Sequence, residues 1–216
     1  MKPDLEAFKK AMQACTHSAA RNRPLSLKET LQKLADAVGE DERVDVYGEG
    51  ELIEQFEQQI ATLLGKEKAL FLPSGTMAQP IALKIWAEQQ RTPYAGLHAT
   101  SHVQLHEHNA YQLLYGLHGV TVGQIHEVPT LDDIKAAAVN PLAAVLLELP
   151  MREIGGQLPD WEDLVEQSTW LRQQNIRVHM DGARLWQCPA AYDKSLAEIS
   201  ALFDSVYVSF YKDLGG

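Results

Sequence analysis

The stretch that decides the fold is Ile176-Arg177-Val178-His179-Met180-Asp181-Gly182-Ala183-Arg184, a short strand-like segment with an apolar residue at every second position that ends on a carboxylate, a glycine and an arginine. Two further apolar runs, at residues 143–149 and 206–210, have the length of buried strands. Amphipathic helical patterns lie between these runs, one opening at Asp160 and one capped by Ser195. Strands that alternate with amphipathic helices predict an α/β fold, in which a mostly parallel sheet is covered by helices on both faces.

The N-terminal part of the chain carries helical patterns. Ser26 and Glu29 have the spacing of a capping box and precede apolar residues that share one helix face. A second amphipathic pattern covers residues 52–64. We therefore predict an N-terminal helical segment at residues 1–45 and a large α/β domain at residues 46–216.

Composition narrows the class of protein. The formal net charge of −10 argues against nucleic acid and anionic membranes as partners, because both bind cationic surfaces. No apolar stretch is long enough to span a bilayer, and the N-terminus lacks the apolar run of a secretion signal. The two cysteines, Cys15 and Cys188, suit a reducing compartment and exclude a cysteine-based zinc framework. We expect a cytoplasmic protein.

A possible anion site follows the first predicted strand. That strand covers residues 69–72, and Ser74-Gly75-Thr76 then leads into a helix predicted at residues 77–89. The backbone N–H groups and the dipole at the start of a helix bind phosphate groups. An ordinary helix cap explains the same three residues.

A carboxylate, an arginine and a lysine follow the later strands, namely Asp181, Arg184 and Lys212. Ligands of such sheets bind outside the carboxyl ends of the strands, so we expect these side chains to meet there. The set fits pyridoxal phosphate, which needs a lysine amine for a Schiff base, a carboxylate at its pyridine nitrogen and a phosphate cradle. Ser209, three residues before Lys212, can add a hydroxyl to that cradle.

Each of these residues also has a simpler interpretation. A lysine after a strand is usually a solvated surface residue. Asp181 followed by glycine is typical of a turn, Arg184 is equally consistent with a surface ion pair, and Ser209 with an ordinary strand serine.

The segment from His98 to His108 is rich in histidine. His98, His102 and His106 would share one face if the segment were helical, which leaves a histidine-ligated metalloenzyme open as an alternative. The same residues fit an extended chain equally well, and no second cluster of ligands accompanies them. We predict no metal site and expect one of these rings to lie over a pyridine ring instead.

Taken together and in their order along the chain, several segments of this sequence resemble those of the low-specificity threonine aldolase and aromatic amino acid β-eliminating lyase family. The members of this family are fold-type I pyridoxal phosphate enzymes. The resemblance runs from about residue 46 to the end of the chain. The matching segments are Val46-Tyr47-Gly48-Glu49, Phe71-Leu72-Pro73-Ser74-Gly75-Thr76-Met77-Ala78, Ser101-His102 with Glu107, His179-Met180-Asp181-Gly182-Ala183-Arg184-Leu185, and Asp204 through Gly215.

The resemblance implies an aspartate aminotransferase-like large domain with a seven-stranded, mostly parallel sheet. It assigns Lys212 to the Schiff base and Asp181 to the pyridine nitrogen. It places His102 over the ring, with His106 as the fallback. Arg184 would bind the cofactor at its phenolic oxygen or orient the carboxylate of the substrate. Ser74, Gly75, Thr76 and Ser209 would hold the phosphate.

The implied activity is that of a lyase of amino acid metabolism, which cleaves threonine-like β-hydroxy amino acids to glycine and an aldehyde. The implied assembly is a homodimer or homotetramer. Three departures bear on this activity: Met151 replaces a histidine, Asp213 replaces a glycine, and the small C-terminal domain of the family is missing from this sequence. They leave open β-elimination on another β-substituted amino acid, or a catalytically inactive fragment that binds the cofactor weakly.

Overall fold

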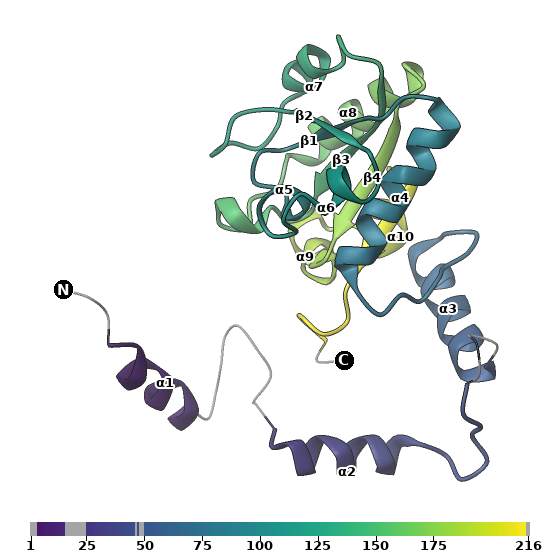
Figure 1. Ribbon diagram of the computed structural model, residues 1–216, viewed down its shortest axis with the longest axis vertical. Helices are drawn as coiled ribbons and strands as arrows, with labels where there is room; N and C mark the ends of the chain where they lie inside the picture. Colours follow the sequence, from purple (N-terminus) through teal and green to yellow (C-terminus); the bar gives the residue numbers. More distant parts are fainter. Residues whose placement is uncertain (1–3, 16–24, 46, 48–49, 215–216) are drawn as a thin grey trace. The chain divides into compact units, whose positions relative to one another are not determined.

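The computed structural model describes residues 4–15, 25–45, 47 and 50–214 (Figure 1). The chain forms two compact units. One is Asp45–Ser209, and the other combines Met1–Val44 with Phe210–Gly216.

The larger unit is built on a parallel sheet of five strands. These are β1 (Tyr94–Leu97), β2 (His118–Thr121), β3 (Leu142–Glu148), β4 (Arg177–Gly182) and β5 (Ser205–Val208), arranged in the order β2-β1-β3-β4-β5. The first six residues of β3 are buried, as expected for a central strand with both faces covered. The carboxyl ends of β3, β4 and β5 therefore lie side by side.

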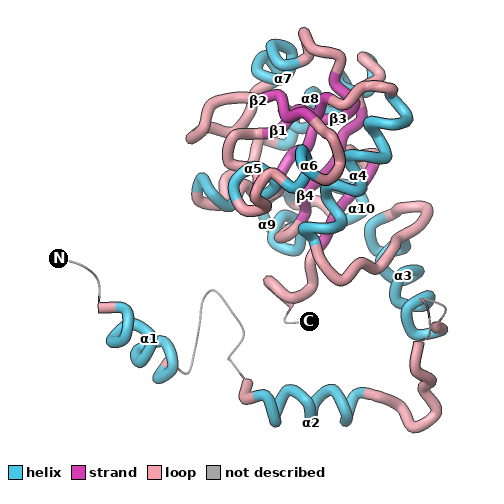
Figure 2. The backbone as a smooth tube through the Cα atoms, viewed as in Figure 1, coloured by secondary structure: helices cyan, strands magenta, loops and turns pink. Residues whose placement is uncertain are grey.

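Helices cover both faces of this sheet (Figure 2). On one face α4 (Gly75–Gln90) packs against β3, β4 and β5, and Leu83 and Ala87 enter the core there. On the other face, α7 (Leu131–Ala137), α8 (Trp161–Gln173) and α10 (Leu196–Ser200) close a second core. The remaining elements are α3 (Glu51–Leu64), α5 (His102–Leu105), α6 (Ala110–Leu113), α9 (Cys188–Tyr192) and two 3-10 turns, Arg152–Ile154 and Leu185–Gln187.

A buried polar network fastens α4 to the sheet. His179 of β4 bonds through Nδ1 to Ser205 Oγ at 2.7 Å and through Nε2 to Gln79 Oε1 at 3.1 Å. Trp86 of α4 donates from Nε1 to the same serine oxygen at 2.8 Å. Burial lowers the pKa of His179 to about 4, so the ring stays neutral and the network carries no buried charge.

The smaller unit contains α1 (Leu5–Ala14) and α2 (Leu27–Ala37). Asp4 caps α1, and the predicted capping box of Ser26 and Glu29 opens α2. None of the residues of α2, all of which are described, is buried. Within residues 4–15, 25–45, 47 and 50–214, no helix is long and apolar enough to cross a membrane.

The predicted α/β class with a mostly parallel sheet is confirmed, and the runs at residues 143–149, 176–180 and 206–210 correspond to β3, β4 and β5. The strand predicted at residues 69–72 is wrong: no described strand pairs with this segment, and Leu70 and Phe71 are exposed. Five strands also replace the seven implied by the resemblance, as far as the described residues go.

Candidate functional site

Three side chains form a row at the carboxyl edge of the sheet. Glu148 of β3 is the register partner of Asp181 on β4, and Asp181 is the register partner of Tyr207 on β5. Partners on adjacent parallel strands point to the same face, which is here the face covered by α4, because His179 lies two residues before Asp181 and contacts that helix. The row brings two carboxyl groups and a phenol to one place.

Asp181 is held firmly at the end of β4. Its side chain is 2% exposed, and Oδ1 accepts the backbone N–H of Ala183 at 3.1 Å. Its carbonyl accepts the N–H of Leu149 at 3.0 Å. Gly182 follows because a Cβ at this position would lie 2.6 Å from the carbonyl oxygen of Tyr207, too close for any side chain. The Asp-Gly sequence here belongs to a strand rather than to the turn that it would suggest in isolation.

Glu148 is the ionisable group most perturbed by this arrangement. Burial first, and then the negative charge of Asp181, raise the pKa of the Glu148 carboxyl to about 7. The N–H of Arg152, which donates to Glu148 Oε1 at 3.2 Å, and the charges of Arg184 and His102 lower the pKa in part. These interactions place Arg184 and His102 in the surroundings of the two carboxyl groups.

His102 begins α5, downstream of β1, and a buried carboxylate sets its orientation. Its Nδ1 lies 2.9 Å from Oε1 of Glu107, whose side chain is fully buried. The other oxygen of Glu107 is buried and has no hydrogen-bond partner in the part of the chain that the structure describes. Since the His102 side chain is 37% exposed, a face of the ring remains accessible to a ligand.

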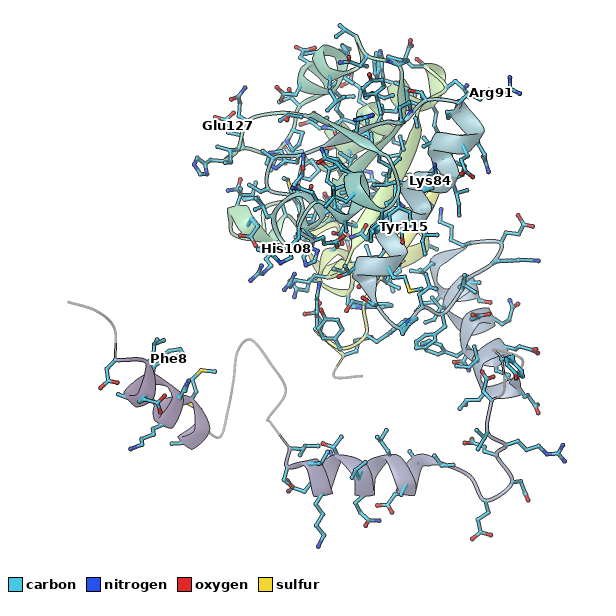
Figure 3. The ribbon with its side chains drawn as sticks, viewed as in Figure 1. Phe8, Lys84, Arg91, His108, Tyr115 and Glu127 are labelled. Atoms are coloured by element: carbon cyan, nitrogen blue, oxygen red, sulfur yellow. The ribbon has the colours of Figure 1, made fainter. Side chains whose placement is uncertain are left out.

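The first turn of α4 lies beside the same row. A side chain at Gly75 would overlap the hydroxyl of Tyr207, so the start of this 16-residue helix touches β5 directly. Ser74 makes no side-chain cap with the described residues, and its carbonyl accepts the N–H groups of Met77 and Ala78. The N–H groups of Gly75 and Thr76 precede the first complete helical turn and are available to a ligand. Arg91, which is labelled in Figure 3, is the C-cap at the opposite end of α4.

Ser209 follows β5 and is 3% exposed. Its Oγ is buried and has no hydrogen-bond partner among the described residues, which is costly unless a ligand supplies one. Its carbonyl accepts the indole N–H of Trp186 at 2.7 Å, so the backbone at this position is fixed.

Comparison with known proteins identifies the family. Residues 27–216 match the family model described as beta-eliminating lyase. The chain belongs to this family. It is 34% identical over 168 residues to "Aldolase vrtJ" of Penicillium aethiopicum, covering 74% of this chain and 42% of that protein. It is 31% identical over 180 residues to the low specificity L-threonine aldolase of Saccharomyces cerevisiae, covering 79% of this chain and 45% of that protein.

Solved structures agree with the family and the fold. A candidate L-allo-threonine aldolase from Listeria monocytogenes matches with a TM-score of 0.92 at 43% identity, covering 98% of this chain and 58% of that one. An aromatic-amino-acid aminotransferase from Burkholderia pseudomallei matches with a TM-score of 0.56 at 14% identity, over 98% of this chain and 60% of that one, and so shows the aminotransferase-like fold alone. The chain spans about half the length of the curated relatives that it matches.

Two further residues that the family resemblance singles out have other surroundings within their own units. Lys212 follows the last residue of β5 by four positions and belongs to the smaller unit, where its Nζ lies 5.6 Å from the ring centroid of Tyr211. Met151, at which the resemblance led us to expect a histidine, is 3% exposed and pairs through its backbone with Gln157. The side chain at position 151 is thus part of the packed interior.

The helical arrangement considered from sequence holds for His102 and His106, which lie at the start and the C-cap of α5, but it is wrong for His98, and residues 103–105 are helical rather than extended. α5 starts only at His102, and His98 bonds instead to Thr100 Oγ1 and the carbonyl of Gln124, both at 2.8 Å. His106 lies with its ring centroid 5.2 Å from that of His102 and bonds through Nε2 to Glu153 Oε1 at 3.0 Å. Among the described residues, no group of three His, Cys, Asp or Glu side chains is placed to hold a metal ion.

Sequence reasoning missed Glu148 and Tyr207 as members of the site. A carboxylate that closes an otherwise fully apolar strand was a usable signal for Glu148, since such a residue rarely lies at the end of a buried strand without a partner. Tyr207 gave no such signal, because an aromatic residue in a strand is ordinary.

Proposed function

We propose that this chain is the pyridoxal phosphate-binding part of a lyase that cleaves threonine-like β-hydroxy amino acids to glycine and an aldehyde. The observation that carries the proposal is the row at the sheet edge, where the buried Asp181 carboxylate faces the same side as the open first turn of α4. Membership of the beta-eliminating lyase family and similarity to proteins named threonine aldolase support it.

The residues fit the cofactor. The N–H groups of Gly75 and Thr76, the hydroxyls of Ser74 and Thr76, and the orphaned Oγ of Ser209 would hold the phosphate. Asp181 would face the pyridine nitrogen and favour its protonated form. Bound in this way, the cofactor supplies an electron-withdrawing ring that takes up the electron pair of the broken bond.

The remaining roles follow from position and chemistry. The ring of His102, fixed by Glu107, would lie against the cofactor, and Arg184 would orient the carboxylate of a small amino acid. Lys212 would hold the cofactor aldehyde through its amine and later move a proton to or from the substrate carbon. We further propose a homodimer or homotetramer in the cytoplasm, a compartment that suits a chain whose only cysteines are Cys15 and Cys188, far apart in the sequence.

The Lys212 assignment has a direct test. Borohydride reduction of the chain loaded with pyridoxal phosphate, followed by peptide mass mapping, should find a pyridoxyl adduct on Lys212. The matched control is Lys84, which pairs with Glu88 on α4. An adduct on Lys84 or Lys194 in place of Lys212 would show that the assignment is wrong.

The family description favours a second candidate, β-elimination on another β-substituted amino acid. Both reactions use the same ring and lysine, and they differ in the bond that breaks. Release of glycine from L-threonine or L-allo-threonine supports aldol cleavage, whereas release of pyruvate and ammonia from a β-substituted alanine supports elimination. A chain that forms the cofactor adduct but releases neither product is a catalytically inactive cofactor-binding fragment.

A further inference from the structure

Two carboxyl groups lie side by side at the edge of the sheet, and only one of them is explained by the proposed function. Glu148 and Asp181 are register partners on β3 and β4, and their side chains share a face. Each accepts one backbone N–H, from Arg152 at 3.2 Å and from Ala183 at 3.1 Å. Asp181 faces the ring nitrogen in the proposed function, whereas Glu148 has no assigned role.

Two adjacent carboxylates in a partly dry site do not both ionise readily. Each loses hydration on burial, and the charge of one opposes ionisation of the other. Glu148 is the partner on which burial and the charge of Asp181 act together, and its pKa is raised to about 7.

The positive groups around Glu148 offset this effect only in part. Arg184, which follows β4, and His102 of α5 favour the ionised form, as does the N–H of Arg152 in its own loop. The side chain of Arg152 pairs with Glu153, and only its backbone N–H is seen to bond to Glu148. These groups therefore do not return the pKa of Glu148 to its ordinary value.

We propose that Glu148 and Asp181 act as one acid–base pair that exchanges a single proton with solvent near neutral pH, at the Glu148 carboxyl. Glu148 is then a positioning residue, because it acts on a ligand through Asp181. A cation held at Asp181 also attracts negative charge on Glu148, so binding of a protonated pyridine ring draws the proton out of the Glu148 carboxyl. This part rests on the proposed function, whereas the pairing of the two carboxyl groups does not.

The test follows the Glu148 proton directly. The full chain is labelled with glutamate carrying ¹³C at the side-chain carboxyl, and its spectrum is recorded between pH 5 and pH 9 without cofactor. The Glu148 signal is the one missing from the Glu148→Gln variant. We expect a titration midpoint near pH 7, a lower midpoint in Asp181→Asn, and a higher midpoint in Arg184→Gln.

The two substitutions of charged neighbours have opposite expected signs, so the pairing stays testable if one of them fails to fold. The control Glu88→Gln removes a carboxylate near the far end of α4 and should leave the Glu148 midpoint unchanged. The pairing is overturned if the Glu148 midpoint of the wild type lies below about pH 5.5. It is also overturned if neither Asp181→Asn nor Arg184→Gln shifts that midpoint.

The cofactor is then added at a saturating concentration. We expect the Glu148 midpoint to fall by about one pH unit or more, as for a carboxyl that gains a nearby cation. An unchanged midpoint in a chain that shows the visible band of bound pyridoxal phosphate overturns the linkage to the ligand. A chain without that band contradicts the proposed function alone, because the cofactor-free titrations stand independently.

Discussion

Replacing Glu148 by glutamine should stabilise the cofactor-free chain at alkaline pH and not at acidic pH. Glutamine keeps the shape of the protonated carboxyl but cannot ionise. In the folded chain the pKa of Glu148 is about 7, against an ordinary value of 4.5. The folded state therefore binds the proton more tightly than the unfolded state, so the wild-type chain loses stability as pH rises from 4.5 through 7.

The size of this effect follows from the pKa difference. A shift of 2.5 units, the difference between 7 and 4.5, corresponds to about 3 kcal/mol at pH values well above 7. Between pH 5 and pH 8 the advantage of Glu148→Gln over the wild type should grow by about 2 to 3 kcal/mol. Any constant cost of the amide, such as a poorer bond to the N–H of Arg152, cancels in this comparison between two pH values.

Urea unfolding at the two pH values measures this growth, with Glu88→Gln as the control for a general change in net charge. Glu88 is exposed and forms a salt bridge with Lys84 on α4. Replacing Glu88 by glutamine should therefore change the free energy of unfolding by a similar amount at both pH values. If Glu148→Gln differs from the wild type by the same amount at pH 5 and pH 8, Glu148 is ionised in both states and the reasoning fails.

Two other substitutions probe the same edge of the sheet. Gly182→Ala should destabilise the chain by about 3 kcal/mol, because the new Cβ would lie 2.6 Å from the carbonyl oxygen of Tyr207 and the two strands would have to separate. Urea unfolding measures this loss of stability. The control is Gly39→Ala, whose Cβ meets only ordinary van der Waals contacts. Asp181→Asn should still retain the cofactor in a borohydride trapping assay. It should lose most of its turnover of a β-hydroxy amino acid, since a neutral amide no longer favours a protonated ring nitrogen. Turnover at the wild-type rate would show that Asp181 has only a structural role.

The sequence predicted the later half of the sheet well. Strand β3 carries an uninterrupted apolar run up to Glu148, as expected for a buried strand of a parallel sheet. Strands β4 and β5 place apolar residues at every second position, Val178 and Met180 in β4 and Val206 and Val208 in β5. The capping box of Ser195 and Glu198 was equally readable, because its hydrogen bonds are local in the sequence.

Strands β1 and β2 were missed because each is four residues long and contains a glycine, which weakens any strand pattern. In β1 that glycine is required by packing: a Cβ at Gly96 would lie 2.9 Å from the side chain of Val145. The reverse error occurred at residues 69–72, where an apolar run suggested a strand. A strand exists only where a neighbour pairs with it, and pairing is not visible in a single segment.

In the candidate site, too, some residues were predictable from the local sequence and others were not. Asp181 was predictable because a polar residue after a buried strand is conspicuous. The perturbation of Glu148 was not, because it arises from a register partner 33 positions away in the chain, the separation of residues 148 and 181. Long-range register creates this electrostatic pair, and no local pattern encodes it.

One strand register supports both the anchoring of α4 and the candidate site. His179 and Ser205 form the row that fastens α4, and Asp181 and Tyr207 form the next row, two residues further along β4 and β5. Because side chains alternate between the faces of a strand, a slip of β5 by one residue would turn both Ser205 and Tyr207 to the opposite face. The helix would lose its bond from Trp86, and its first turn would lose the contact between Gly75 and Tyr207. The structural network therefore selects the register that places the start of α4 beside the acidic pair.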